Sequence, residues 1–195
     1  MAFITKSEAL AAFRESQGRQ TVRKSARDVL RESADSFYDG KKYAVFLSHC
    51  HEDAEMIAGV KYMLEKAGIS VYVDRIDDPQ LDPSGVTPAT ADKLRVRMRS
   101  CASMLFATSK SSPNSKWMPW ELGYFDGLRQ GQIAILPLVE SPTDGFKGQE
   151  YIGLYPVFER LPTTTGGQAH VVRTPEKYML FEDFASGRQL YHDFR

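Results

Sequence analysis

The sequence predicts a three-layer α/β fold in which helices cover both faces of a parallel sheet. Four short segments are almost entirely apolar, as strands buried on both faces are. Stretches of helical period separate these segments, so each strand is expected to reach the next by a crossover connection. The four apolar segments are YAVFLS (43–48), ISVYVD (69–74), SMLFATS (103–109) and QIAILPLVE (132–140).

Residues 1–40 are expected to form a helical extension in front of the sheet. Thr5 and Glu8 have the spacing of a capping box, in which each side chain bonds the backbone N–H of the other residue. Apolar residues then recur with helical period over 22–37. The turn sequence YDGKK, at 38–42, leads from this extension to the first strand.

The segments between the strands carry helix start and stop signals. An apolar stripe runs through 53–68 and ends at a glycine. Thr87 and Pro88 are suited to the N-cap and the first position of a second helix. Pro119 fits the first turn of a third helix, which is expected to end near residue 131.

Beyond residue 140 the pattern weakens. Strands are expected at 157–161 and 169–173, and a helix between Thr174 and Gly187. Residues 163–167, TTTGG, have the composition of a flexible connector. The predicted organisation is a helical N-terminal extension at 1–40, a central domain at 41–162 and a short C-terminal α/β tail at 163–195.

Composition and charge exclude several classes of partner. The 25 basic residues balance 25 acidic ones, so no global field attracts nucleic acid or an anionic membrane. The basic stretch at 19–27 is followed by acids and is interpreted as a solvated helix face. The longest apolar runs fall well short of the roughly 20 residues of a membrane helix, and residues 1–19 lack the order of a secretory signal. Two cysteines without a CxxC motif fit a reduced compartment, and we expect a cytoplasmic protein.

Polar residues cluster in the loops that follow the first three strands. These loops read SHCHED, DRIDDP and TSKSSPNSKW. Open parallel sheets bind ligands at the carboxyl ends of their strands. We therefore expect the functional site at this edge.

Several familiar chemistries lack their residues at that edge. His49, His51 and Cys50 stand together, but zinc needs three or four ligands in rigid geometry, and the other histidines lie in the C-terminal tail, so no metal is expected. The G-x-S-x-G elbow and the G-x-G-x-x-G fingerprint are both missing, which argues against a serine hydrolase and a dinucleotide-dependent dehydrogenase. The third strand ends FATSK, without the aspartate of a phosphoacceptor domain.

The stretch SKWMPWELGYFDG, at 115–127, carries both tryptophans of the chain beside Glu121. One interpretation is structural: a glutamate near a helix start is stabilised by the helix dipole, next to tryptophans that pack in the core. The other is functional: a carboxylate held between aromatic walls. Spacing alone leaves both interpretations open.

The order of these motifs resembles that of the Toll/interleukin-1 receptor (TIR) domain family. YAVFLSHCHED resembles the first strand and loop of that family, and ISVYVDRIDDP resembles its second strand, which leads into the BB loop. RMRSCASMLFATSKSSPNSKWMPWEL resembles its third-strand region, with the hallmark S…S.W…E. The resemblance covers about 42–161 and implies the flavodoxin-like sheet of the TIR fold. The sequence of these motifs is most similar to that of bacterial stand-alone members, including those of Thoeris-type anti-phage systems.

TIR domains are either adaptors or enzymes that cleave NAD+ at the nicotinamide glycosidic bond. The enzymes carry their catalytic glutamate in a W-x-x-x-E motif, which here runs from Trp117 to Glu121. The resemblance therefore implies that Glu121 is catalytic, that NAD+ is the substrate and that no further cofactor is needed. Nicotinamide leaves as a neutral ring and needs no general acid, so one carboxylate that stabilises the ribosyl cation can suffice. The product would be ADP-ribose or a cyclic or conjugated form of it.

Other family positions carry over residue by residue as substrate-binding candidates. Cys50 departs from the basic or aromatic residues that enzymatic members have in the first loop. Trp120 is expected to anchor the helix in the core. The loop at 74–86, which matches the BB loop, is expected to be mobile and to gate activation. The substrate-binding candidates are Phe46, Ser48, His49, Cys50, His51, Asp74 and Trp117.

The predicted function is an NAD+ glycohydrolase or cyclase of bacterial anti-phage defence. The resemblance implies homo-oligomers built through TIR–TIR contacts on activation, and a separate effector that senses the product. One alternative is a non-enzymatic adaptor, or a mimic of host TIR domains, which acts through TIR–TIR binding. Another is a related N-ribosyl hydrolase of a different nucleotide.

Overall fold

The computed structural model describes residues 2–18, 23–38, 40–74, 87–142, 144, 151–162 and 168–194. Most of the loop at 74–86 that was expected to gate activation, and the connector expected at 163–167, lie outside these ranges. Among the described residues, no helix has both the length and the apolar character needed to cross a membrane.

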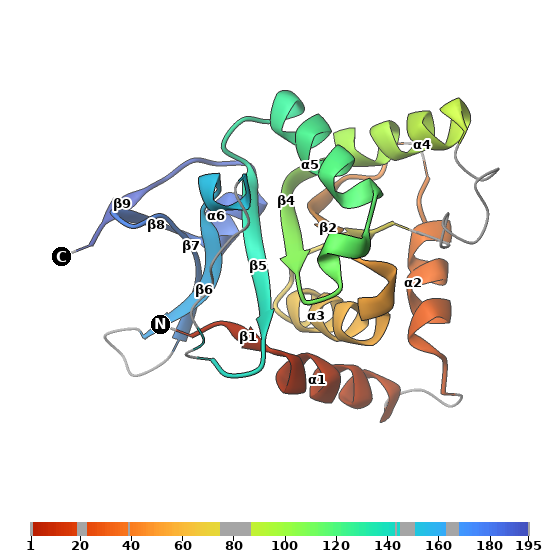
Figure 1. Ribbon diagram of the computed structural model, residues 1–195, viewed down its shortest axis with the longest axis horizontal. Coiled ribbons are helices and arrows are strands. Elements are labelled where there is room, and N and C mark those ends of the chain that lie inside the picture. The colour runs from red at the N-terminus through yellow and green to blue at the C-terminus, as the bar shows by residue number, and fades with distance from the viewer. Residues whose placement is uncertain are drawn as a thin grey trace.

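The described strands form one nine-stranded sheet, with the order β3-β2-β4-β5-β6-β7-β8-β9 and with β1 paired to β5 (Figure 1). Pairing is parallel from β3 across to β6, as the crossover connections predicted. It is antiparallel from β6 to β9. The strands are β1 (Ile4–Thr5), β2 (Tyr43–Ser48), β3 (Val71–Val73), β4 (Cys101–Thr108), β5 (Ile133–Val139), β6 (Val157–Pro162), β7 (Gln168–Arg173), β8 (Lys177–Leu180) and β9 (His192–Asp193).

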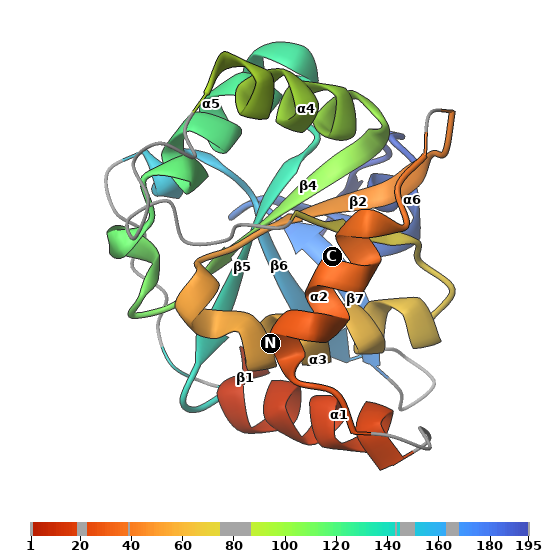
Figure 2. The same cartoon turned by 90° about the vertical axis from the view of Figure 1, so that its right-hand side faces the viewer.

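Helices cover both faces of the sheet and confirm the three-layer α/β fold. Helices α1 and α3 lie on one side of the sheet and α4 and α5 on the other (Figure 2). Each side has its own apolar core, and α2 and α6 contribute to the core on the α3 side. The helices are α1 (Lys6–Gly18), α2 (Ala26–Asp35), α3 (Ala54–Lys66), α4 (Pro88–Arg99), α5 (Trp117–Leu128) and α6 (Phe181–Ala185).

The helix starts follow the signals in the sequence. The amide of Glu8 donates to the Oγ1 of Thr5 at 3.1 Å, and the amide of Thr5 donates to the Oε2 of Glu8 at 2.8 Å, which completes the capping box at α1. At α4 the Thr87 hydroxyl accepts a hydrogen bond from the amide of Thr90, with Pro88 as the first helical residue. Both caps satisfy amides that have no partner within the helix.

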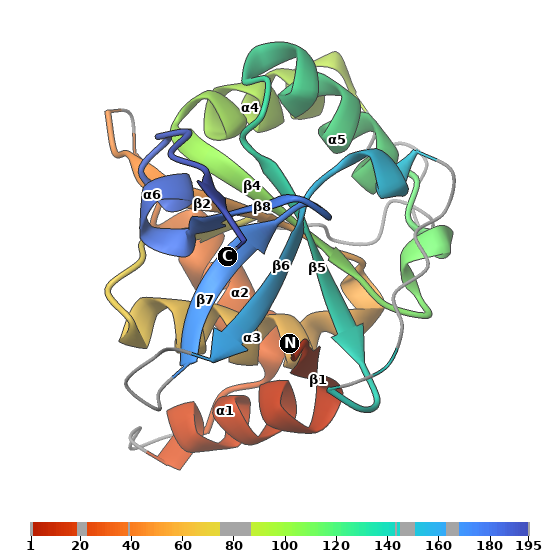
Figure 3. The same cartoon turned by 90° about the vertical axis from the view of Figure 1, so that its left-hand side faces the viewer.

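The N-terminal segment is tied into the sheet and onto a helix. Ile4 pairs with Leu138 of β5, and Ala2 forms a bridge with Arg160 (Figure 3). α1 then packs so closely on α3 that a Cβ added at Gly59 would lie 1.8 Å from the carbonyl oxygen of Ala9. Only a glycine permits this approach of the two backbones.

The expected helix from Thr174 to Gly187 is wrong over its first half. Residues Lys177–Leu180 form β8, and the helix α6 covers only Phe181–Ala185. The hydroxyl of Thr174 accepts a hydrogen bond from the amide of Lys177 and closes a tight turn instead of capping a helix. The chain can then pair antiparallel with β7, whose free edge supplies hydrogen bonds that an isolated segment lacks.

Side-chain alternation along β2 prepares the site. Val45 and Leu47 face the core on the α3 side, whereas Phe46 faces the core under α4 and α5. Successive side chains of a strand point to opposite faces, so Ser48 shares the face of Phe46. The last residue of the strand therefore brings a hydroxyl to the carboxyl edge of the sheet on the α5 side.

Candidate functional site

Glu121 is completely buried on the inner face of α5. Its Oε2 accepts a hydrogen bond of 2.5 Å from the hydroxyl of Ser48 at the end of β2. Its Oε1 is buried too, and no donor among the described residues reaches it. One oxygen of the carboxyl group is thus fixed by the protein, and the other is buried without a hydrogen-bond partner among the described residues.

The position of Glu121 on α5 argues against an explanation of its motif by the helix dipole alone. The helix begins at Trp117, and the Ser115 hydroxyl accepts a hydrogen bond from the amide of Met118 at 3.3 Å. The helix has no acid in its first turn, because Glu121 is its fifth residue. The carboxyl group faces the interior and binds Ser48, so the helix dipole does not account for it.

The environment changes the protonation of Glu121. Burial disfavours the charged carboxylate and raises the pKa of Glu121 to about 8. The negative charge of Asp74 acts in the same direction, and the hydrogen bond from Ser48 opposes both. At neutral pH the carboxyl group is therefore mostly protonated. A strongly shifted carboxyl group at the ligand-binding edge of a sheet is typical of a functional site.

Asp74 follows β3 and lies at the level of Ser48. Val73 pairs with Leu47 in the parallel ladder. The residues that follow them, Asp74 and Ser48, therefore lie side by side. The Oδ1 of Asp74 accepts two hydrogen bonds, one from the Tyr72 hydroxyl at 2.8 Å and one from the Nη1 of Arg97 at 2.6 Å. Asp74 is therefore a fixed side chain of the site.

His49 is buried and neutral. Burial disfavours the imidazolium ion and lowers the pKa of His49 to about 4, although the charge of Asp74 opposes this shift. The Nδ1 of His49 has no hydrogen-bond partner among the described residues. His49 is therefore a buried, uncharged ring beside Ser48.

The neighbours of His49 differ in exposure. Cys50 is buried in the core under α4 and α5. His51 is half-buried and begins a short 3-10 helix, His51–Asp53. The structure thus brings Ser48, Asp74 and Glu121 to one place, whereas Cys50 lies behind it in the core.

The aromatic candidates lie at different depths. Phe46 is completely buried, and its ring centroid lies 5.8 Å from that of Tyr72. Trp117 is half-buried and packs edge-on against Trp120, with centroids 5.4 Å apart. Trp117 and Glu121 are four residues apart and share a face of the helix. Trp120 is half-buried and packs against the core under α4 and α5, where Phe125 of the same helix is fully buried.

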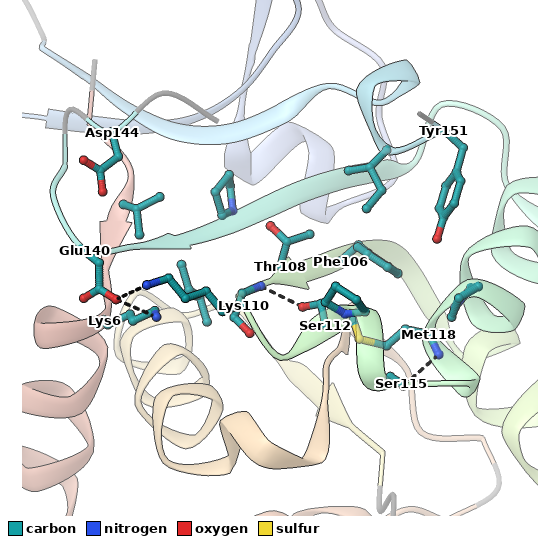
Figure 4. A pocket seen from close by; sticks show the side chains of 17 residues that line it. Lys6, Phe106, Thr108, Lys110, Ser112, Ser115, Met118, Glu140, Asp144 and Tyr151 are labelled. Carbon is teal, nitrogen blue, oxygen red and sulfur yellow. Dashed lines mark hydrogen bonds and ion pairs between the residues drawn. The ribbon is translucent and has the colours of Figure 1, made fainter. Parts of the chain in front are cut away.

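A cavity of about 590 Å³ lies beside this site, over the carboxyl ends of β4 and β5 (Figure 4). Glu121 does not line it. Phe106 and Met118 do, and Phe106 pairs with Ser48 in the ladder. The cavity is therefore one strand away from the carboxyl group of Glu121, on the same edge of the sheet.

The polar wall of the cavity is balanced in charge. The Nζ of Lys6 lies 2.8 Å from the Oε1 of Glu140, and the Nζ of Lys110 lies 3.8 Å from the same oxygen. Asp144 also lines the cavity, while Tyr151 stands at the end near α5 (Figure 4). The polar loop that follows β4 was expected at this edge of the sheet, and it supplies one part of this wall. Nothing in the sequence indicated the part that Lys6 and Tyr151 contribute.

Sequence reasoning also missed Arg97 and the hydroxyl of Tyr72, which hold Asp74. An arginine in an amphipathic helix has the appearance of a surface residue, so no pattern singles it out. Within the described ranges, no group of three or more His, Cys, Asp or Glu side chains is arranged to hold a metal ion.

Comparisons with known proteins agree with the fold and the motifs. The TIR domain family matches residues 45–160. The chain is 43% identical over 163 residues to a Bacillus cereus (strain MSX-D12) protein named probable 3' cyclic ADP-D-ribose synthase ThsB', with 82% of this chain and 84% of that protein covered. It is 29% identical over 99 residues to a Cytobacillus dafuensis protein named putative cyclic ADP-D-ribose synthase TIR2, with 50% of this chain and 26% of that longer protein covered. The chain belongs to the TIR domain family.

Proposed function

We propose that this protein cleaves NAD+ at the nicotinamide N-glycosidic bond and closes the remaining ADP-ribose into a cyclic signal in bacterial anti-phage defence. The observation that carries the proposal is the buried carboxyl group of Glu121, with one oxygen held by Ser48 and the other without a partner in the part of the chain that the structure describes. The names of the two relatives, both cyclic ADP-D-ribose synthases, support the same reaction.

The carboxylate of Glu121 is suited to stabilising the ribosyl cation that forms as nicotinamide leaves. The hydrogen bond from Ser48 fixes the side-chain torsion, so that Oε1 needs no reorganisation when the positive charge develops. Complete burial strengthens the attraction, because opposite charges interact more strongly where water is excluded. The leaving ring departs neutral, which explains why a single carboxylate suffices.

Substrate binding should switch Glu121 into its active form. The pKa of Glu121, about 8, keeps the group mostly protonated at neutral pH. The nicotinamide ring of NAD+ carries a positive charge, and a nearby positive charge favours the carboxylate. The charged form is therefore present mainly when the substrate that needs it is bound.

Ring closure follows from the same groups. The C–N bond to nicotinamide breaks and its electron pair stays on the ring nitrogen. A hydroxyl of the adenosine ribose then forms a C–O bond with the ribosyl carbon, and its proton passes to Glu121. The name of the Bacillus cereus relative suggests the 3' hydroxyl as the attacking group.

The substrate-binding candidates take different roles in this proposal. His49, His51, Asp74 and Trp117 are assigned to contacts with NAD+. Phe46 and Cys50 are buried in the core, and they are assigned to shaping the floor beneath Ser48.

The wider function is proposed on the family resemblance. The protein acts in the cytoplasm, assembles on activation into homo-oligomers through TIR–TIR contacts, and passes its cyclic product to a separate effector. NAD+ serves as substrate, and no other cofactor takes part. The proposal includes neither nucleic acid nor membrane as a partner.

The test is NAD+ turnover with identification of the product by mass. Wild type and Glu121→Gln are compared at high protein concentration with a crowding agent. Release of nicotinamide by wild type alone, with a second product lighter than ADP-ribose by one water, would support the cyclase. A product with the mass of ADP-ribose would indicate hydrolysis. No turnover by wild type, with assembly confirmed by light scattering, would contradict an enzymatic function and favour the adaptor.

A further inference from the structure

Arg97 lies on α4 and reaches across to the end of β3. Its Nη1 lies 2.6 Å from the Oδ1 of Asp74, and the Tyr72 hydroxyl donates to the same oxygen at 2.8 Å. The Oδ2 of Asp74 takes no hydrogen bond from the described residues. Two donors thus fix one oxygen of Asp74, and the other has no partner among the described residues.

The guanidinium group of Arg97 is itself held in place by aromatic rings. Its Cζ lies 5.7 Å from the ring centroid of Tyr72 and 6.0 Å from that of Phe37, and these two rings pack edge-on against each other. The side chains of Arg97 and Asp74 are 23% and 10% exposed. This pair is therefore unlike a solvated surface ion pair, which holds its geometry weakly.

Asp74 stands beside the reaction centre. The parallel register places it level with Ser48, whose hydroxyl holds Glu121. Asp74 and Glu121 share one arrangement, in which protein donors hold one carboxyl oxygen and the other has no partner among the described residues. A ribose ring carries two neighbouring hydroxyls, and each can donate a hydrogen bond to one such oxygen.

We propose that Arg97 is a positioning residue for NAD+ cleavage: with Tyr72 it holds Oδ1 of Asp74 so that Oδ2 accepts a hydrogen bond from a hydroxyl of the ribose that loses nicotinamide. The inference rests on the proposed function of the site. Arg97 touches no substrate atom and acts only through Asp74. Its positive charge also offsets that of Asp74, so that two carboxyl groups can share one small site.

An arginine fits this role better than a lysine. Its planar guanidinium group stacks on aromatic faces while it donates to a carboxylate, whereas an ammonium group is a flexible point charge. Arg97→Lys keeps the charge and a donor but loses the stacking on Phe37 and Tyr72. Arg97→Lys should therefore keep part of the kcat/KM for NAD+ that Arg97→Met loses.

The test compares kcat and KM for NAD+ among Arg97→Met, Arg97→Lys, Asp74→Asn and the double variant Arg97→Met/Asp74→Asn. Arg99→Met is the matched control, because Arg99 lies on the same helix and its Nε donates to the Tyr124 hydroxyl at 2.9 Å, away from Asp74. Hydrogen bonds to charged groups predict a fall in kcat/KM of about tenfold to a hundredfold for Arg97→Met and for Asp74→Asn, mainly through KM. The double variant should be no worse than Asp74→Asn alone, and Arg99→Met should resemble wild type.

Three outcomes would overturn the inference. One is kcat/KM within about twofold of wild type in Arg97→Met, and another is losses that multiply in the double variant, as independent sites do. The third is a fall in activity of Arg97→Met and Arg97→Lys that is fully explained by a smaller fraction of folded protein, as thermal melts measure it, with KM unchanged. The proposed function is tested separately in the same series by Glu121→Gln. If wild type turns over no NAD+, or Glu121→Gln equals wild type, the proposed function fails and this inference fails with it.

Discussion

The hydroxyl of Ser48 and the carboxyl group of Glu121 are joined by a hydrogen bond of 2.5 Å across 73 positions of the sequence. The bond connects the last residue of β2 to the second turn of α5. It is the only hydrogen bond that the described residues make to the Glu121 carboxyl group, so the orientation of that group depends on Ser48.

Ser48→Ala should therefore impair the enzyme without unfolding it. Loss of the donor raises the pKa of Glu121 further, because the Ser48 hydrogen bond favours the carboxylate. Loss of a hydrogen bond to a charged group predicts kcat/KM for NAD+ lower by about tenfold to a hundredfold at neutral pH. Ser103→Ala is a matched control, since the buried hydroxyl of Ser103 on β4 donates to the carbonyl of Ala44 at 2.9 Å. Full activity in Ser48→Ala would contradict a positioning role.

Glu121 should make the folded state less stable at alkaline pH. Its pKa rises from 4.5 to about 8 on folding, so its stabilising contribution is complete below pH 4.5 and is lost as the pH rises through 8. Glu121→Gln lacks this titration. The melting temperature of the variant should exceed that of wild type by an increasing margin, reaching several degrees, between pH 5 and 9, as measured by calorimetry. A constant difference across this range would refute the raised pKa.

His49 should have the opposite effect at acid pH. Its pKa falls from 6.5 to about 4 on folding, so the stability linked to its neutral form is present above pH 6.5 and is lost as the pH falls through 4. His49→Gln should flatten the decline of the free energy of unfolding between these values in urea titrations. His192→Gln, on the exposed strand β9, is the control and should leave the decline unchanged. An equal decline in wild type and His49→Gln would count against the buried neutral ring.

Gly59→Ala should separate α1 from α3. The added methyl group would lie 1.8 Å from the backbone oxygen of Ala9, so one helix must move. Overpacking of this kind predicts destabilisation of about 1–3 kcal/mol or more in chemical unfolding. Gly123→Ala in α5 has open space around the new group and should leave the protein as stable or slightly more so. Equal stability of the two variants would show that α1 is not docked against α3 in solution.

The layered fold could be predicted from local patterns, whereas the catalytic role of Glu121 is implied only by the family resemblance of its motif. Apolar runs such as 43–48 need burial on both faces wherever they lie, and the W-x-x-x-E spacing specifies one face of a helix. Arg97 could not be found in this way, because its role depends on Asp74, an acid 23 positions earlier on a different element. Lys6 lines the cavity because it forms an ion pair with Glu140, which lies 134 positions later in the sequence. No local pattern indicates such a contact. Lys177–Leu180 forms a strand because it pairs with the edge of β7. Local propensity cannot predict this pairing, because it depends on a neighbouring strand.

The pairing of Ile4 with Leu138 has a consequence for how the protein is made. A ribosome releases the chain from its amino end, and β1 emerges long before its partner β5 exists. The bridge from Ala2 to Arg160 forms later still. During translation β1 therefore stays unpaired until β5 has been synthesised. Contacts between residues so far apart in the sequence also form slowly. β1 can therefore join the sheet only after β2, β3 and β4 have been synthesised, although it precedes them in the chain.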